Sequence, residues 1–413
     1  MEKGSDLGRL WWAYAVSTYG TWTAFGAFPL IAVRVLDASA FAVSLLEAAG
    51  IAVSALVAFP LGPWIEHRPK RPVMIATDLV RFAALASVPV AYVLGLLSYV
   101  QLLLVSVVSG TAGLAFTAAS GAYLKHLVRG DRLLAANGRF EGTLWVATAA
   151  GPPVGGALVE LLGPVVTVLT DSLSHLPSAM AVRRIRGSDV ATPRDPAARP
   201  GAAGLLHGGR VIVHDPVLRR LFLNQVLVSG LITATTPLLA VLLLGEYHLP
   251  AWQYGLAFGV PALGGFAGAR LSARLVRRYG RHRVLAASGW LRSLFPIGLA
   301  FLRPGVPGLV TLIVVEGLLI TCMGVFNPIH ATERLRRTPG DSAARVLSTW
   351  SVGSRLVQAA LLLTWGVLAT LTGPLPAITA SGTLLLTTPL LLPRRRHMTD
   401  LATTAPSKDV PAT

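Results

Sequence analysis

The sequence predicts an all-α membrane protein of twelve transmembrane helices, arranged as two pseudo-symmetric six-helix bundles. Of 413 residues, 53% are hydrophobic and only 13% are charged, with a mean hydropathy of +0.62, whereas soluble domains carry about 25% charged residues. Apolar runs of about 20 residues, long enough to cross the bilayer core, recur along the chain. An internal repeat divides these runs six and six.

Twelve apolar spans account for most of the chain. They cover residues 10–34, 41–64, 73–98, 99–124, 137–162, 164–182, 218–243, 250–276, 284–302, 306–332, 345–371 and 374–393. The segment before the first span is short, mixed in charge and followed by no cleavage site, so we expect the first helix to remain in the protein.

Lys and Arg residues concentrate in alternate breaks between the spans. If both termini are cytoplasmic, the inside segments hold basic clusters such as 68–71, 277–283 and 394–396, while the outside breaks hold Arg34 and Arg303. The positive-inside rule therefore predicts a multi-pass protein of the inner cell membrane with both termini cytoplasmic. The same placement explains the net charge of +17 as topology determinants near anionic lipid, so no nucleic-acid partner is expected.

The longest break separates two halves. It is rich in Arg, Pro, Ala and Gly, a composition typical of linkers. We expect an N-terminal six-helix bundle over 1–182, a cytoplasmic linker over 183–217, a C-terminal six-helix bundle over 218–393 and a disordered cytoplasmic tail over 394–413. Within the linker, residues 205–213 are a candidate surface helix.

The two halves repeat one another at an offset of about 210 residues. The matching pairs are Gly130-Asp131 with Gly340-Asp341, Gly163-Pro164 with Gly373-Pro374, and residues 68–73 with residues 279–284. Three matches in the same order indicate a duplication. Halves related by an axis along the membrane normal are typical of transporters that rock around a central site.

The break after the second span resembles a loop of a known family. Residues 62–71, GPWIEHRPKR, are similar to the Gly-x-x-x-Asp-Arg-x-Gly-Arg-Lys loop of the major facilitator superfamily. Glu66, His67 and Pro69 depart from that pattern, so the resemblance implies a gating function retained only in part; the alternative is a basic loop that merely sets topology. The expected gating residues are Gly62, Glu66, Arg68, Lys70 and Arg71, with Asp78 and Arg81 as gate or anchor contacts on the third helix.

A glycine- and proline-rich sequence marks the fifth helix. Its residues Gly151, Pro152, Gly155 and Gly156 are similar to the Gly-Pro-x-x-Gly-Gly motif associated with antiporters in the same superfamily. Proline bends a helix and glycine lets a neighbouring backbone approach closely. We expect a close contact between the halves here, with the glycine-rich eighth helix as partner; packing without a transport role is the alternative.

Further segments resemble the bacterial branch of multidrug, macrolide and siderophore exporters. They are residues 133–141, 338–345 and 171–174 with 183–186, and the resemblance runs from Arg9 to about Leu392. Many relatives have an acidic residue after a glycine of the first helix, where this chain has Gly20-Thr21-Trp22. A residue that binds a proton or cation in this chain must therefore lie elsewhere.

Ionisable side chains inside the spans are candidates for proton coupling, because each costs about 2.5–3.5 kcal/mol to insert. Glu316 and Arg355 lie roughly 15 Å deep at 1.5 Å per residue. The resemblance implies that the tenth helix lines a cavity, so Glu316 is the first candidate for proton exchange. A structural ion pair with Arg355 or Arg292, or substrate binding, is the alternative. Asp171 and Glu47 are further candidates, with helix packing as their alternative role.

Polar side chains on the helices expected to line the cavity are candidates for substrate binding, since ligand pockets are mostly apolar with a few polar groups. They are Tyr14, Thr18, Thr21, Trp22, Asn224, Gln225, Asn327 and Arg355.

The resemblance implies a monomeric secondary active transporter that exports small drug-like or secondary-metabolite molecules by proton antiport and confers antibiotic resistance. The expected partners are a small molecule, protons and membrane lipids. Alternatives are a lipid or lysophospholipid transporter of the same fold, with a headgroup site near Arg355, and a nontransporting sensor. The single cysteine, Cys322, allows no disulfide or metal-ligand spacing, so no cofactor or metal is expected. The sequence shows no cluster of residues with the spacing of a catalytic site, so we do not expect an enzyme.

Overall fold

The structure, a computed structural model, describes residues 2–66, 68–128, 131–187, 202–338 and 343–393. The expected tail, residues 188–201 of the expected linker, and the side chains of residues 58–67, with Gly62 and Glu66, lie outside the described part.

Within these residues the chain is helical throughout. The α-helices are α1 (Glu2–Thr23), α2 (Ala27–Arg34), α3 (Ala40–Glu66), α4 (Lys70–Val93), α5 (Tyr99–Leu127), α6 (Asp131–Leu162), α7 (Pro164–Arg183), α8 (Ala202–His214), α9 (Pro216–Ala240), α10 (Ala251–Tyr279), α11 (Arg281–Leu294), α12 (Val306–Arg337), α13 (Ala343–Thr372) and α14 (Pro374–Leu385). Three shorter helical segments are η1 (Val241–Glu246), η2 (Phe295–Phe301) and η4 (Thr388–Leu391).

Eleven helical spans in the described part are long and apolar enough to cross a membrane, and they correspond in order to the second to twelfth predicted spans. The all-α membrane fold is thus confirmed. The first predicted span, residues 10–34, is divided between α1 and α2. The break lies at Gly26, whose φ of +82° favours glycine. A Cβ atom there would also lie only 2.8 Å from Tyr254 Cε1.

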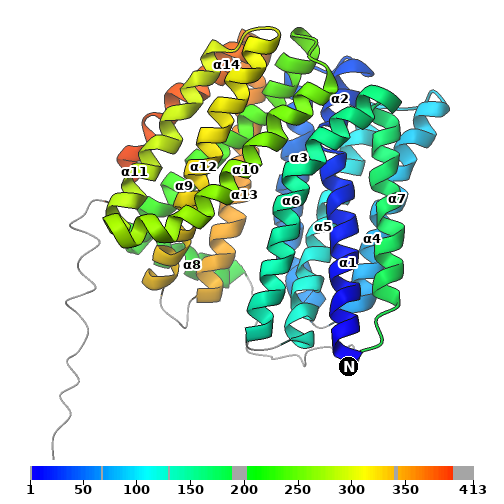
Figure 1. Ribbon diagram of the computed structural model, residues 1–413, viewed down its shortest axis with the longest axis horizontal. Coiled ribbons are helices and arrows are strands. Elements are labelled where there is room, and N and C mark those ends of the chain that lie inside the picture. The colour runs from blue at the N-terminus through cyan, green and yellow to red at the C-terminus, as the bar shows by residue number, and fades with distance from the viewer. Residues whose placement is uncertain (1, 67, 129–130, 188–201, 339–342, 394–413) are drawn as a thin grey trace, which may run out of the picture.

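The helices stand in two groups, α1–α7 and α9–α14 (Figure 1). The groups lie against each other at the end that carries α2, here named the far end. They diverge toward the end that carries α8 and the N-terminus, here named the linker end (Figure 1).

Glycines bring α6 and α10 together across the two groups. A Cβ atom on Gly156 would collide with the Ala251 carbonyl of α10, and one on Gly255 would collide with the Pro152 carbonyl of α6. Gly155 instead faces Thr23 of α1, within its own group. The contact expected from the fifth-helix motif therefore exists, but only Gly156 of its glycine pair lies there.

Two charged side chains join the groups at the far end. Arg34 Nη2 donates to the Leu249 carbonyl oxygen at 3.3 Å, just beyond the C-terminal end of η1. Glu160 Oε2 accepts a hydrogen bond from the backbone nitrogen of Ala251 at 3.0 Å, at the start of α10. Each charge has the sign that the nearby helix end attracts, so both contacts favour a closed far end.

Replacing Gly156 with Leu tests the α6–α10 contact. The larger side chain has no space against the Ala251 carbonyl, and overpacking of this kind costs about 1–3 kcal/mol. We expect a lower apparent melting temperature of the purified protein in detergent. Gly142→Leu is the matched control, because no heavy atom lies within 4 Å of the Cβ position at Gly142 on the same helix. Equal melting temperatures of the two variants would contradict the close contact.

Candidate functional site

A cavity of about 510 Å³ lies where the N-terminal helix group meets α9 and α10. Its wall is mostly apolar, and its charged groups are Glu47, Arg81 and Asp171. The lining residues are Thr21, Ala24, Phe25, Gly26, Phe28, Pro29, Val43, Leu46, Glu47, Arg81, Leu85, Ser106, Ser109, Gly110, Gly113, Asp171, Thr236, Pro237 and Tyr254. An apolar wall with a few polar groups is the usual composition of a small-molecule site.

Aromatic rings connect the two helix groups beside this cavity. Phe25 stacks between Trp22, at a ring-centroid distance of 5.9 Å, and Tyr254 of α10, at 6.3 Å. Phe258 of α10 packs on Phe25 at 5.3 Å. Because Phe25 and Tyr254 line the cavity from opposite groups, a movement of one group relative to the other would change its shape.

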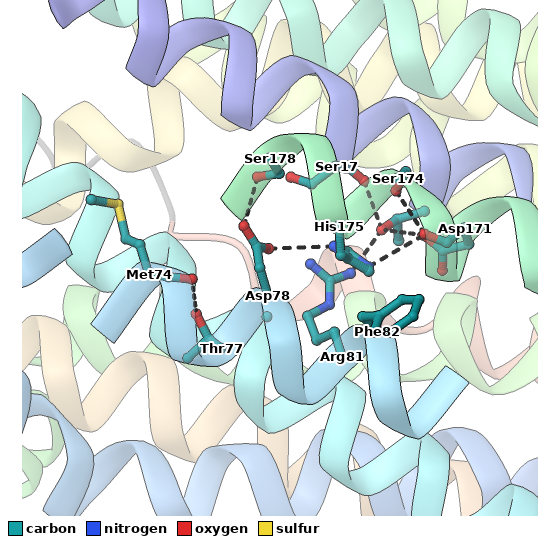
Figure 2. A network of polar contacts seen from close by, with 12 residues as sticks. Ser17, Met74, Thr77, Asp78, Arg81, Phe82, Asp171, Ser174, His175 and Ser178 are labelled. Carbon is teal, nitrogen blue, oxygen red and sulfur yellow. Dashed lines mark hydrogen bonds and ion pairs between the residues drawn. The ribbon is translucent and has the colours of Figure 1, made fainter. Parts of the chain in front are cut away.

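A buried histidine lies between two carboxylates behind the cavity wall (Figure 2). His175 Nδ1 lies 3.3 Å from Asp78 Oδ1, and His175 Nε2 lies 3.5 Å from Asp171 Oδ1. These separations are within ion-pair range, but neither ring nitrogen has a well-directed hydrogen bond. Asp78 Oδ2 also accepts a hydrogen bond from the Ser178 hydroxyl at 2.6 Å. The helices α4 and α7 that carry these residues pack along their length.

Arg81 supplies the positive charge of this network. Its Nη2 donates to Thr21 Oγ1 at 2.8 Å, and that hydroxyl lies 3.3 Å from Asp171 Oδ1, to which it can donate. The guanidinium interacts electrostatically with both Asp171 and Asp78. Arg81 therefore stabilises both carboxylates from inside the helix group.

The Asp171 carboxylate lies close to the position in the first helix where many relatives have an acidic residue. Gly20 lets α1 approach α7 so closely that a Cβ atom there would collide with Ser174 and lie 3.2 Å from Asp171 Oδ1. Thr21 then contacts the same carboxylate. A negative charge next to this part of α1 thus comes from α7 instead of α1.

Glu316 lies in the C-terminal helix group, apart from the cavity. It is 8% exposed on α12 and is not among the lining residues. Among the described residues it forms no ion pair with Arg355 or Arg292. Its burial without a cationic partner leaves a titratable carboxylate in the second group.

Arg292 is fully buried. It lies 211 residues after Arg81, the same offset that relates Val284 to Val73 in the internal repeat, so the two arginines occupy equivalent positions. Its guanidinium donates to the side-chain oxygens of Asn224 and Gln225 and stacks 3.5 Å from the Phe326 ring. The two arginines therefore differ in surroundings: Arg81 faces carboxylates, and Arg292 faces neutral amides.

The other substrate candidates are spread over both groups. The Tyr14 ring packs against Phe140 of α6 at a centroid distance of 4.8 Å, Thr18 is half-buried on α1, and Asn327 is exposed on α12. Arg355 is half-buried on α13. None of these four lines the cavity.

Two contacts of the described gating residues lie within the N-terminal helix group. Lys70 Nζ donates to the Arg68 carbonyl at 2.8 Å. Arg71 Nη2 donates to the carbonyl of Arg183 at 3.2 Å, which joins the start of α4 to the end of α7. These contacts are anchors at the linker end in this conformation.

His175 is not among the residues that the sequence pattern indicated. A signal for it was present, because an imidazole one helical turn after Asp171 inside an apolar span shares a helix face with that carboxylate. Its pairing with Asp78 depends on the packing of α4 against α7, which spacing within one helix does not give.

In the described residues, no group of three or more His, Cys, Asp and Glu side chains is arranged to hold a metal ion.

The chain matches the model of one protein family and resembles known transporters. Residues 10–360 match the profile of the Major Facilitator Superfamily. The "Multidrug efflux pump Tap" of Mycolicibacterium fortuitum is 24% identical over 312 residues, 73% of each chain. The protein of the same name from Mycobacterium tuberculosis is 26% identical over 74% of this chain and 73% of its own.

Solved transporters share the fold. The structure of nucleoside transporter NupG has a TM-score of 0.71 at 11% identity, covering 97% of this chain and 99% of its own. A bacterial homologue of the iron transporter ferroportin has a TM-score of 0.71 in its inward-facing state and 0.57 in its outward-facing state, both at 18% identity and covering 93% of this chain and 98% of its own.

Replacing Arg81 tests whether the buried charges depend on one another. Arg81→Met leaves the two carboxylates without their cation, and breaking a buried ionic contact in this way costs about 3–5 kcal/mol. We expect a large fall in the apparent melting temperature, partly restored in the double variant Arg81→Met/Asp171→Asn, because one of the unbalanced charges is then removed. Additive losses in the double variant would mean that Arg81 and Asp171 are not coupled.

Proposed function

Because the chain belongs to the Major Facilitator Superfamily, whose members are secondary transporters, we propose that it exports small drug-like molecules from the cell in exchange for protons. The observation that carries this proposal is the cavity between the helix groups. It is large enough for part of a drug-sized molecule, and its wall combines aromatic rings with carboxylates.

The carboxylates of the cavity suit a cationic, partly apolar substrate. Among the described residues Glu47 has no ion-pair partner, and it lies close enough to Tyr254 to act on it electrostatically. A substrate cation there would find a negative charge beside an aromatic ring, both of which attract it. Asp171 and Glu47 are therefore our preferred proton-coupling groups, because each can exchange a proton against a bound cation. Glu316 remains a candidate in the second helix group.

Topology and relatives support export as the direction of transport. The basic residues at the linker end favour a cytoplasmic location for that end. In that orientation the closed far end faces outward, and this conformation is ready to load substrate from the cytoplasm. The names of the mycobacterial relatives, multidrug efflux pumps, support export. A lysophospholipid headgroup site at Arg355 is disfavoured because Arg355 does not line the cavity.

Transport of ethidium, a fluorescent lipophilic cation, into proteoliposomes with an imposed pH gradient tests this proposal. We expect gradient-driven uptake by the wild type. Asp171→Asn should lower it by about 100-fold, the scale on which loss of a proton-transfer group acts.

Glu246→Gln is the control, because Glu246 ends η1 and does not line the cavity. Glu47→Gln and Glu316→Gln locate the coupling group: a loss confined to Glu316→Gln would move it to the second helix group. Absence of gradient-driven ethidium movement in the wild type would contradict the proposed function.

A further inference from the structure

The buried network around His175 carries an electrical imbalance. With Asp78 and Asp171 ionised, Arg81 protonated and His175 neutral, the four groups sum to one negative charge. Asp78 and His175 are completely buried, and Asp171 is 5% exposed. A net charge in such surroundings is expensive, whereas one added proton makes the network neutral. The network is therefore suited to hold one exchangeable proton.

No other ionisable group in the described residues joins this network. The helices α1, α2, α4 and α6 pack against α7. From α4 come Asp78 and Arg81, and from α1 come hydroxyl groups such as Thr21. Within the described side chains, α2 and α6 contribute no hydrogen bond or ion pair to His175. The proton has three places to reside, the two carboxylates and the imidazole.

The three acceptors are ordered from the cavity into the protein. Asp171 lines the cavity, and His175 and Asp78 do not. Along α7, Ser178, the hydroxyl partner of Asp78, lies seven residues beyond Asp171 toward the linker end, about 10 Å along the helix axis. An imidazole between two carboxylates can accept a proton on one nitrogen and release one from the other.

We propose that His175 is a proton-transfer residue that moves the network's single proton between Asp171 and Asp78. When a cation binds in the cavity, the O–H bond of protonated Asp171 breaks and its proton bonds to His175 Nε2. The N–H bond at Nδ1 then breaks, and that proton bonds to Asp78 Oδ1. Asp171 is left ionised for the substrate, and the total charge of the network is unchanged. This inference rests on the proposed function for the identity of the cation.

Two measurements on the full-length protein in lipid test the transfer. In proteoliposomes, His175→Gln should lower ethidium uptake driven by a pH gradient by about 100-fold, while ethidium exchange at equal pH falls by no more than about twofold. His330→Gln is the matched control: His330 is a buried imidazole in the other helix group, stacked on Phe326 and against Trp350. Both rates should change by no more than about twofold in that control.

The second measurement needs no substrate. In protein labelled with ¹⁵N-histidine, the His175 imidazole signals, assigned by their absence in His175→Gln, report which ring nitrogen carries the proton. Asp171→Asn should favour the proton on Nδ1, beside Asp78, and Asp78→Asn should favour it on Nε2, beside Asp171.

The outcomes separate the transfer from the transport activity. Equal losses of exchange and gradient-driven uptake in His175→Gln would mean that His175 has a structural role, and this would overturn the inference. Unchanged rates of both processes would also overturn it. If wild-type protein moves no ethidium, the proposed function fails. The imidazole signal then decides alone: a signal unaffected by Asp171→Asn and Asp78→Asn would overturn the transfer, and the expected response would support it.

Discussion

Charge neutrality inside the membrane-spanning helices is the constraint on which the proposed mechanism depends. Asp78 and Asp171 are buried, and in the proposed mechanism Arg81 and one additional proton offset their negative charges. Because Asp171 also forms part of the cavity wall, whatever occupies the cavity changes the electrical balance of the whole network. Substrate binding and proton binding then affect each other through electrostatics, and the substrate does not need to contact the proton.

The contact between α6 and α10 sets how that linkage can become movement. Glycines bring the two helices together at the far end, where Arg34 and Glu160 add polar contacts between the groups. The two groups diverge toward the linker end (Figure 1). A joined far end and separated linker ends describe one of two conformations between which such a fold can rock. The balance between them shifts only if the proton binds one conformation more tightly than the other.

The sequence predicted the helical membrane fold well, because apolar runs and loop charges are local features. It could not place side chains that meet through packing. His175 was overlooked because its second carboxylate, Asp78, comes from a helix about a hundred residues away. The candidate helix at 205–213 is present as α8, but the sequence does not show its neighbour: Gly208 is where α8 meets the Arg345 backbone of α13. The choice of Glu316 depended on its depth and on the resemblance that puts the tenth helix at the cavity, whereas the position of the cavity depends on how the two groups meet.

Electron–electron distance measurements test the central claim most directly. With Cys322 replaced by Ser, spin labels at Gly138 and Arg277 report on the linker end, and labels at Leu96 and Val306 report on the far end. We predict that changing the pH shifts the two distance distributions in opposite directions, and that Asp171→Asn abolishes this response. Distances that do not change with pH, that change in the same direction at both ends, or that respond normally in Asp171→Asn would contradict the account.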